Sequence, residues 1–206
     1  MKKGVFIAIE GGDGSGKSSA VQWLKQELGE EKFLFTREPG GIDSAEEIRN
    51  VLVKHREQDL EVLTQLFLFE AGRTEHVTKK IRPALESGMH VITDRFSASS
   101  YAYQVVAGGA PHLKSFFEDA DQRARGGLLP DLTIFLDVAP EIGIARKSSS
   151  GDELNTFDTK ELAFYTNVRN GVKEYLADKP HVTINAEQSQ ENVRGAIKKE
   201  ILKITT

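Results

Sequence analysis

The sequence contains no cysteine among its 206 residues. This absence excludes disulfide bonds and thiolate metal sites, and it is compatible with the cytoplasm. No apolar run could span a membrane, and the run at 5–9 ends at Glu10, too short for the core of a signal peptide. Internal repeats and low-complexity tracts are also missing. We therefore expect a single cytoplasmic domain over residues 1–206, large enough to bury a substantial core.

An excess of positive charge is also missing. The 27 Lys and Arg residues are outnumbered by 31 Asp and Glu residues, which gives a formal net charge of −4. This balance argues against a dedicated nucleic-acid binder, and no nucleic-acid or membrane partner is expected. The histidines show no metal-ligand spacing and are expected at the surface: His55, His76, His90, His112 and His181.

Glycine, by contrast, is concentrated near the N-terminus. Four glycines fall within the six positions 11–16, directly after the apolar, strand-like run 5–9. Gly11, Gly16, Lys17 and Ser18 fit the phosphate-loop pattern G-x-x-x-x-G-K-[ST], although a glycine-rich turn without a ligand remains the alternative. Glycines allow backbone N–H groups to point at phosphate oxygens, and the helix that follows presents its positive end to them.

The pattern assigns a chemical task to each polar residue of this loop. Lys17 supplies a charge for the β- and γ-phosphates of ATP, and the hydroxyl of Ser18 ligates Mg²⁺. The expected ATP-binding residues are Gly11, Gly12, Asp13, Gly14, Ser15, Gly16, Lys17, Ser18 and Ser19.

Strand-like runs recur along the whole chain, with helical patterns between them. They lie at 5–9, 32–36, 89–93, 132–136 and 181–184, and the helix after the phosphate loop is expected at 17–28. This alternation predicts an α/β fold, a parallel sheet with helices on both faces. Ligands of such folds bind at the carboxyl ends of the strands, so the residues after each strand matter most.

The second and third predicted strands are each followed by charged residues. The turn 36–41 holds Arg37 and Glu38, although on its own it could be an ordinary surface turn. Asp94 and Arg95 follow the third strand. Beside a phosphate loop, the carboxylate of Asp94 can join the Mg²⁺ shell and the fork of Arg95 can span two phosphates.

A long helix is expected from about Asp59, a plausible N-cap, to about Leu85. Its predicted core stripe consists of Leu60, Leu63, Phe67 and Ala71. Phe69 and Arg73 lie four positions apart on another face, where an aromatic ring and a guanidinium can hold a planar base. A core phenylalanine beside a surface arginine is the alternative.

Two further segments complete the sequence-based interpretation. Asp137, after the fourth strand, is either a second metal-shell carboxylate or the N-cap of the helix near Pro140, and we favour the cap. The polar segment at about 147–158 has the composition of a flap, and it follows the cationic pair Arg146 and Lys147.

Several segments together resemble the thymidylate kinase family of P-loop nucleoside monophosphate kinases. They are 9–19, 36–41, 69–73, 94–104 and 130–138, in the family's order and spacing. The Thr-Arg-Glu-Pro-Gly-Gly and Asp-Arg-Phe…Ala-Tyr-Gln segments are more specific than the phosphate loop. The resemblance implies a three-layer P-loop fold with a five-stranded parallel sheet of order 2-3-1-4-5, a homodimer, and transfer of phosphate from ATP with Mg²⁺ to dTMP.

The resemblance also implies a site for the thymidine part of the substrate. Phe69 would stack on thymine, and Arg73 would bond its carbonyl edge. Ser100 and Gln104 would contact the base as well. Tyr103 would crowd the 2′ position of the sugar and so favour deoxyribose.

The phosphates and the ATP adenine are assigned by the same resemblance. Arg37, Arg49 and Arg95 would hold the acceptor phosphate with support from Glu38, and Asp13 would meet the 3′-hydroxyl. The adenine pocket would be formed by Arg146 and the region of Asn185 and Ala186. Lys17, Arg95 and Arg146 are the predicted catalytic residues, and Ser18 and Asp94 the predicted Mg²⁺ ligands.

The sequence departs from the family where a catalytic arginine is expected. The phosphate-loop position holds Gly14, residues 148–150 are serines, and the usual Asp-Arg pair after the flap is Asn155-Thr156. The source of the neutralising cation is therefore left open between Arg146 and Lys147. Another nucleotide or nucleoside kinase of this fold, or a weakly catalytic nucleotide-binding protein, is the alternative function.

Overall fold

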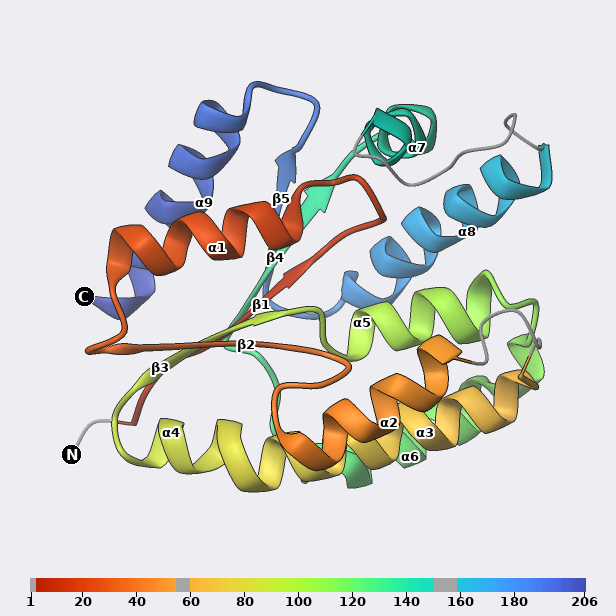
Figure 1. The fold of residues 1–206 in the computed structure, drawn as a ribbon, viewed down its shortest axis with the longest axis horizontal. Helices are drawn as coiled ribbons and strands as arrows, with labels where there is room; N and C mark the ends of the chain where they lie inside the picture. The colour runs from red at the N-terminus through yellow and green to blue at the C-terminus, as the bar shows by residue number, and fades with distance from the viewer. Residues whose placement is uncertain (1–2, 55–59, 150–158) are drawn as a thin grey trace.

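The computed structural model describes residues 3–54, 60–149 and 159–206. A parallel sheet of five strands lies at its centre, in the order β2-β3-β1-β4-β5 (Figure 1). The strands are β1 (Phe6–Glu10), β2 (Phe33–Arg37), β3 (His90–Asp94), β4 (Leu132–Asp137) and β5 (His181–Asn185). The predicted fold class, the sheet order and all five predicted strands are confirmed, with strand ends that differ by at most one residue.

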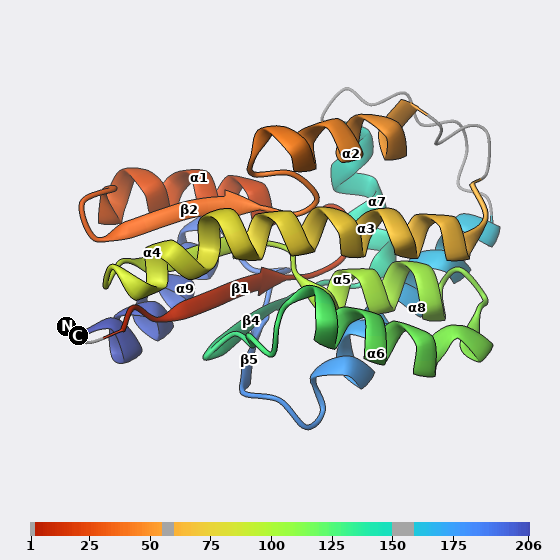
Figure 2. The ribbon, with the colours of Figure 1, turned by 90° about the horizontal axis from the view of Figure 1, so that it is seen from below.

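Helices connect the strands and cover both faces of the sheet (Figure 1 and Figure 2). They are α1 (Lys17–Leu28), α2 (Asp43–Lys54), α3 (Val62–His76), the π-helix η2 (Val77–Ile81), α4 (Arg82–Glu86), α5 (Ser97–Ser100), the π-helix η3 (Tyr101–Val106), the 3-10 helix η4 (Pro111–Leu113), α6 (Lys114–Ala124), α7 (Pro140–Ser149), α8 (Thr159–Leu176) and α9 (Gln190–Thr205). No helix among these described segments combines the length and the apolar character that crossing a membrane requires.

The alternation of side chains along the strands divides the core between the two faces. Ile7 and Ile9 of β1 pack with α1 and α9, whereas Phe6 and Ala8 pack with η2 and α4. All are almost fully buried, since each strand of a covered parallel sheet must be apolar on both sides. A third cluster joins α5 and η3 to α8 through Ala102 and its neighbours.

The predicted long helix is present as the continuous helical segment α3–η2–α4, but its core stripe was wrong. Leu63 and Phe67 are 39% and 56% exposed, and Ala71 is exposed as well. The inward face carries Leu66 and a group of charged residues instead. The stripe was assigned from apolar residue type alone. This criterion misses the inward face, because its charged residues are buried in pairs with residues of other elements. The proposed N-cap Asp59 lies outside the described residues.

Two smaller expectations also need correction. His76 is fully buried instead of exposed, and His90 is half-buried; His112 and His181 are at the surface, and His55 lies outside the described residues. Asp137 does not cap α7, which begins at Pro140, because its carboxylate pairs with Arg169 and Lys173 of α8.

All five strands point in one direction, so their carboxyl ends lie along one edge of the sheet. The register pairs Ile9 of β1 with Asp94 of β3, and Arg37 of β2 with the same Asp94. The phosphate loop, the 36–41 turn and the Asp94-Arg95 turn therefore meet at this edge. The candidate site is built there, as the fold class predicts.

Candidate active site

The phosphate loop, residues 11–18, wraps around the side chain of Lys17. Gly16 adopts a left-handed backbone conformation (φ 88°) immediately before α1 begins, which only glycine adopts without strain. The Lys17 Nζ donates to the carbonyl of Gly12 at 2.7 Å and to Oγ of Ser15 at 3.3 Å. Burial, reinforced by the charge of Arg95, lowers the pKa of Lys17 to about 7. A polyanion bound here would favour the charged ammonium group.

Ser18 and Asp94 meet in the manner expected of magnesium ligands. The Ser18 hydroxyl donates to Oδ2 of Asp94 at 2.6 Å. Oδ1 of Asp94 is buried and has no hydrogen-bond partner among the described residues. An unpaired carboxylate oxygen beside a hydroxyl suits a hard cation that takes oxygen ligands and keeps water and phosphate in its shell. The residues present therefore fit Mg²⁺, which would shield phosphate charge when bound.

Asp13 of the phosphate loop joins side chains from the turn after β3 and from η3, α7 and α8. Its Oδ1 accepts hydrogen bonds from Arg95 at 2.7 Å and from the Tyr103 hydroxyl at 2.8 Å. Its Oδ2 accepts from Tyr165 of α8 at 3.1 Å and from Lys147 of α7 at 3.5 Å. Burial acts to raise the pKa of Asp13, but Arg95 and the other donors hold it well below its usual range. The carboxylate thus stays ionised and fixes two cations beside the loop.

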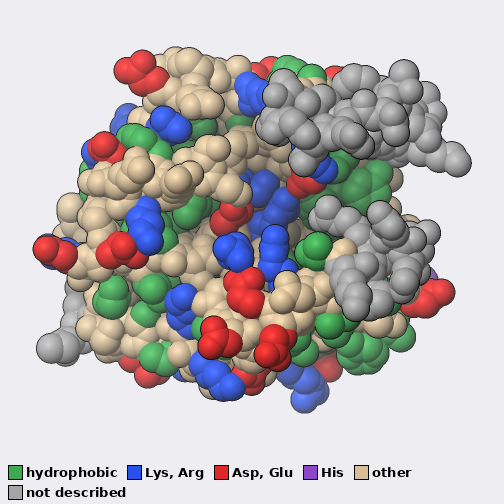
Figure 3. Space-filling model, in the orientation of Figure 1, with side chains coloured by type: hydrophobic (Ala, Val, Ile, Leu, Met, Phe, Trp, Pro, Cys, Tyr) green, Lys and Arg blue, Asp and Glu red, His purple; other side chains and the backbone are tan. Residues whose placement is uncertain are grey.

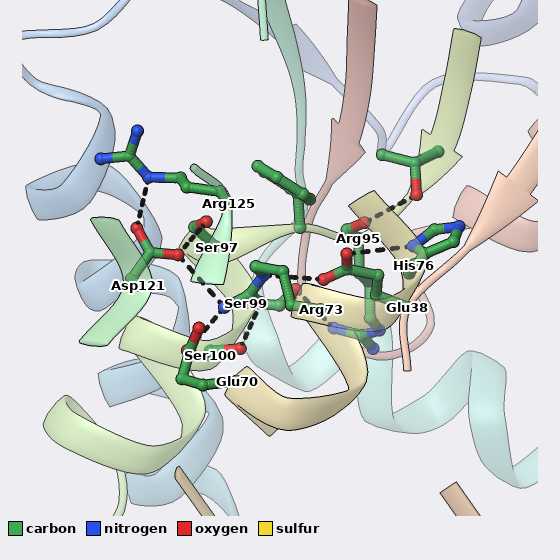
Figure 4. Close-up of polar contacts among 12 residues, drawn as sticks. Glu38, Glu70, Arg73, His76, Arg95, Ser97, Ser99, Ser100, Asp121 and Arg125 are labelled. Carbon is green, nitrogen blue, oxygen red and sulfur yellow. Dashed lines mark hydrogen bonds and ion pairs between the residues drawn. The ribbon is translucent and has the colours of Figure 1, made fainter. Parts of the chain in front are cut away.

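Arg73, predicted to face a base, is enclosed by the protein's own groups (Figure 4). Its Nε donates to Glu38 at 3.0 Å, and its Nη1 donates to Glu70 at 2.6 Å and to Asp121 at 3.1 Å. Its Nη2 donates to Oγ of Ser100 at 2.8 Å. The arginine side chain is only 1% exposed. The alternative of a surface arginine is therefore wrong, and the role in base recognition stays a prediction.

His76 extends this network to the turn after β2. Its Nδ1 lies 3.1 Å from Oε1 of Glu38, and its Nε2 lies 2.7 Å from Oγ1 of Thr36. In the neutral ring, Nδ1 donates to the carboxylate and Nε2 accepts from the threonine hydroxyl. Any side chain at Gly41 would collide with both, since an added Cβ would lie 2.5 Å from Oγ1 of Thr36 and 2.6 Å from Nε2 of His76. The 36–41 turn is thus packed onto a buried imidazole.

The far end of the network contains residues that no sequence motif predicted. Asp121 of α6 accepts from Arg125 through Oδ2 at 2.8 Å, and Ser97 donates to its Oδ1. Burial raises the pKa of Glu70 to about 6 against the opposing charge of Arg73. Three carboxylates surround the Arg73 guanidinium, and burial favours the neutral form of Glu70.

The arginines predicted to hold the acceptor phosphate are Arg37 in the 36–41 turn, Arg49 of α2 and Arg95 after β3. Arg37, half-exposed, donates from Nη2 to both carboxylate oxygens of Glu46 at 2.9 Å. Glu46 also accepts from the N–H of Gly41 at 2.8 Å, and Arg49 donates to the carbonyl of Pro39 at 3.1 Å. The strand register places Arg37 beside Asp94 and hence near Arg95. These three arginines therefore belong to one edge of the sheet.

The residues predicted to contact the base come from two neighbouring helical segments. Phe69 of α3 is half-buried, and Gln104 of η3 is buried with Oε1 lacking a partner among the described residues. Tyr103 packs under the Arg95 guanidinium, which lies 4.9 Å from the ring centroid. Ser100 is engaged by Arg73. An unpaired buried amide oxygen suits a donor such as a ring N–H of a base.

A cavity of about 750 Å³ opens over the phosphate loop. In Figure 3, basic side chains gather near the middle of the face that is shown. Arg146 lines this cavity and donates to the carbonyls of Ala186 at 2.7 Å and Glu187 at 3.4 Å. Asn185 is exposed, and its Oδ1 accepts from the N–H of Glu187 in the same turn. The cavity lining also includes residues that the sequence did not single out: Gln188, Gln190, Val193 and Arg194.

Glu10 lies in the motif segment 9–19, but the sequence assigned it no role. It is fully buried, and its Oε1 accepts from the N–H groups of Phe96 at 2.8 Å and Ser99 at 3.3 Å. Its Oε2 accepts from the Ser99 hydroxyl at 2.6 Å. Burial raises its pKa against the hydrogen bonds from Ser99 and the charge of Arg95. Glu10 holds the turn that carries Arg95, whose φ of 70° is the one positive value recorded for a residue other than glycine in the described part of the chain.

A phosphate loop, a candidate Mg²⁺ pair and cations from several strand ends define a P-loop nucleotide kinase. Comparison with known proteins narrows this class. The thymidylate kinase family model matches residues 9–197. A thymidylate kinase from Hahella chejuensis is 38% identical over 201 residues, which cover 96% of this chain and 95% of the relative. One from Symbiobacterium thermophilum is 42% identical over 199 residues, with 95% and 91% covered. One from Bacillus cereus is 40% identical over 197 residues, with 93% of each chain covered.

The chain therefore belongs to the thymidylate kinase family. The resemblance inferred from the sequence motifs is confirmed.

Proposed function

We propose that this chain transfers the γ-phosphoryl group of ATP to dTMP and forms dTDP, a step toward dTTP. The chain is a kinase of the thymidylate kinase family, and so a phosphotransferase. The observation that carries the substrate assignment is the combination of this membership with an acceptor side that holds Arg37, Arg49 and Arg95. A nucleoside acceptor would need a base for its hydroxyl, whereas three arginines suit an acceptor that is already an anion.

The nucleophile is a phosphate oxygen of dTMP, so no general base is needed. Alignment and neutralisation of two polyanions are the tasks of the protein. Lys17 would meet the β- and γ-phosphates of ATP, and Arg95 would face the acceptor phosphate from the Asp13 side. Asp13 pre-positions Arg95 through their 2.7 Å ion pair before the substrates bind. Mg²⁺ held by Ser18 and Asp94 would supply further neutralisation of phosphate charge.

The thymidine pocket would lie between α3 and η3. Phe69 would stack on the base, Gln104 would accept from its ring N–H through the unpaired Oε1, and Tyr103 would limit the space at the sugar. Arg73 would contribute to recognition of the base from within the buried network, either through Ser100 or by a shift of its guanidinium toward the base. Arg146 and Ala186 would form the adenine side of the cavity.

A coupled assay of ADP formation tests the proposal. The purified chain is mixed with ATP and Mg²⁺, and dTMP, dUMP, dCMP and thymidine are compared as acceptors. The proposal expects the highest kcat/KM with dTMP and no turnover with thymidine. Faster turnover of thymidine or dCMP would reassign the acceptor. Binding of ATP without ADP formation from any acceptor would favour the weakly catalytic binding protein.

We also propose that the protein is a cytoplasmic homodimer. Support comes from exposed apolar side chains of α2 and α3. These two helices lie side by side, and α3 also packs against α6 on its other side (Figure 2). Val53, Leu63 and Phe67 are 51%, 39% and 56% exposed, and Phe67 packs edge-on against Phe116 of α6 at 5.2 Å. Such a patch is typical of an interface between subunits. Sedimentation of the wild-type chain beside Phe67→Glu measures the oligomeric state directly.

A further inference from the structure

We propose that Lys147 is a catalytic residue, whose ammonium group meets the phosphoryl group in transit between ATP and the acceptor. The inference rests on the proposed function and adds to it the cation left open by the sequence. Three features carry it. The backbone of Gly143 leaves no room for a side chain at Gly14, and this contact between the two glycines fixes α7 on the phosphate loop. Arg146 donates its hydrogen bonds to another part of the cavity.

The phosphate loop has no room for a cation at position 14. Gly14 has a φ of +71°, and an added Cβ would lie 1.9 Å from the carbonyl oxygen of Gly143. That distance is far below any real contact, and the obstacle is backbone that cannot rotate away. The charge that a side chain at this position might have supplied must therefore come from another element.

The same contact brings α7 onto the loop. An added Cβ at Gly143 would lie 2.6 Å from the carbonyl oxygen of Asp13, so two glycines allow a backbone-to-backbone approach. Helical residues four apart share a face, and Lys147 is four positions after Gly143. Lys147 therefore projects from the loop-facing side of α7, which lies beside the loop between β1 and α1 (Figure 1).

The position of the ammonium group agrees with this placement. Lys147 lines the phosphate-loop cavity together with Lys17 and Arg95. Its Nζ lies 3.5 Å from Oδ2 of Asp13, while Oδ1 of the same carboxylate holds Arg95 at 2.7 Å. One carboxylate thus fixes two cations next to the phosphates. The contact of Lys147 is the longer of the two, and the flexible stem of a lysine can carry its charge from the carboxylate to a phosphate oxygen.

Arg146 is directed toward another part of the cavity. Its guanidinium donates to the carbonyls of Ala186 and Glu187, after β5. Arg146 and Lys147, three and four positions after Gly143, therefore reach different parts of the cavity. Arg146 borders the nucleotide at the end of β5, and Lys147 faces the phosphates.

Steady-state kinetics of Lys147→Met test the proposal, with Lys147→Arg as the charge-conserving variant. Lys198→Met is the matched control, because the Lys198 side chain is similarly exposed (34% against 31%) and pairs with the carboxylate of Glu27, as Lys147 pairs with that of Asp13. Lys147→Met should lower kcat about 100-fold, with the KM for ATP and for dTMP changed by less than about threefold, because the charge is needed only in the transition state. Lys147→Arg should recover at least about a tenth of the wild-type kcat, and Lys198→Met should behave as wild type.

A binding measurement separates catalysis from support of the fold. ADP, aluminium fluoride and dTMP with Mg²⁺ mimic the transition state, and Lys147→Met should weaken this complex about 100-fold while ATP alone and dTMP alone bind as in wild type. Equal weakening of ATP and the mimic, or a kcat within about threefold of wild type, would overturn the assignment of Lys147. If the wild-type chain transfers no phosphate to dTMP, the proposed function fails and this inference fails with it. Thermal unfolding of each variant reports any loss of folding.

Discussion

Two groups of charged side chains lie at the carboxyl edge of the sheet, and they differ in what balances their charge. In the phosphate-loop group, the cations Lys17, Arg95 and Lys147 line an open cavity. In the other group, Arg73 is enclosed by Glu38, Glu70 and Asp121 and is almost without exposure. The first group keeps positive charge for a ligand, whereas the second neutralises its cation within the protein.

This difference in charge balance follows from the part of the substrates that each group would bind. Triphosphate and monophosphate groups bring several negative charges, so cations placed beside them are stabilised when the ligands arrive. A thymine base carries no charge, and an uncompensated guanidinium facing it would be costly to desolvate. A network that already satisfies Arg73 can offer hydrogen bonds to a base at little electrostatic cost.

The largest loss of stability is expected from removing the cation of the enclosed group. Arg73→Met leaves three carboxylates buried without their cation, and we expect the free energy of unfolding to fall by about 3–5 kcal/mol. Arg95→Met, in the open group, should instead lower kcat and change stability by less than half as much, because Asp13 keeps Lys147 and Tyr165 as partners. Urea unfolding of both variants, followed by circular dichroism, makes the comparison.

Glu70→Gln is the matched control for the Arg73 variant. Since burial raises the pKa of Glu70 to about 6, its charged form is already disfavoured, and the amide oxygen can still accept from Arg73. A loss below about 1 kcal/mol is expected. If Arg73→Met were no less stable than Glu70→Gln, the carboxylates would not depend on Arg73, and the contrast between the two groups would be lost.

In the open group, the protonation state of Lys17 is expected to respond to ligand binding. Because burial and Arg95 lower the pKa of Lys17 to about 7 in the ligand-free protein, Lys17 is mostly neutral at pH 8. Bound phosphates should raise this pKa toward the usual range, so ATP binding should take up roughly one proton at pH 8 and very little at pH 6. Calorimetric binding enthalpies in two buffers of different ionisation enthalpy give the proton count.

Lys17→Arg is the control for this experiment, since a guanidinium is charged in both states and should remove the uptake at pH 8. Uptake that is equal in wild type and variant would place the proton on another group. Uptake that is equal at pH 6 and pH 8 would contradict the lowered pKa of Lys17.

The same contrast explains what could be predicted from the sequence. The phosphate loop, α1 and the strands depend on residues that are adjacent in the chain, so local patterns predicted them nearly to the residue. The network of Arg73 joins residues 35 and 48 positions away, Glu38 and Asp121, and no local pattern points to Asp121. Leu63 and Phe67 were assigned to the core because apolar type alone does not distinguish a core face from an exposed apolar one.

The candidate site was likewise predicted in its parts and not in its connections. Family motifs brought Asp13, Arg95 and Tyr103 into the site, but their common contact at one carboxylate emerged only in the structure. No role was predicted for Tyr165 or Glu10, since each contacts a residue distant in sequence. Asn155 and Thr156, with most of the expected flap, lie outside the described residues.

A smaller effect is expected at Tyr103, which contacts Asp13 and Arg95 of the open group. Burial raises the pKa of Tyr103, so its hydroxyl stays protonated and donates to Asp13. Tyr103→Phe removes that bond but keeps the ring under Arg95. We expect kcat/KM with dTMP to fall roughly fivefold, which corresponds to a loss of about 1 kcal/mol of transition-state stabilisation. Preference for dTMP over its ribose counterpart should persist in Tyr103→Phe, because exclusion at the sugar depends on ring volume. Tyr103→Ala should relax this preference.

Tyr165→Phe, which removes the other phenol from Asp13, is the control and should leave sugar preference unchanged. Loss of preference in Tyr103→Phe would assign selectivity to the hydroxyl instead of the ring.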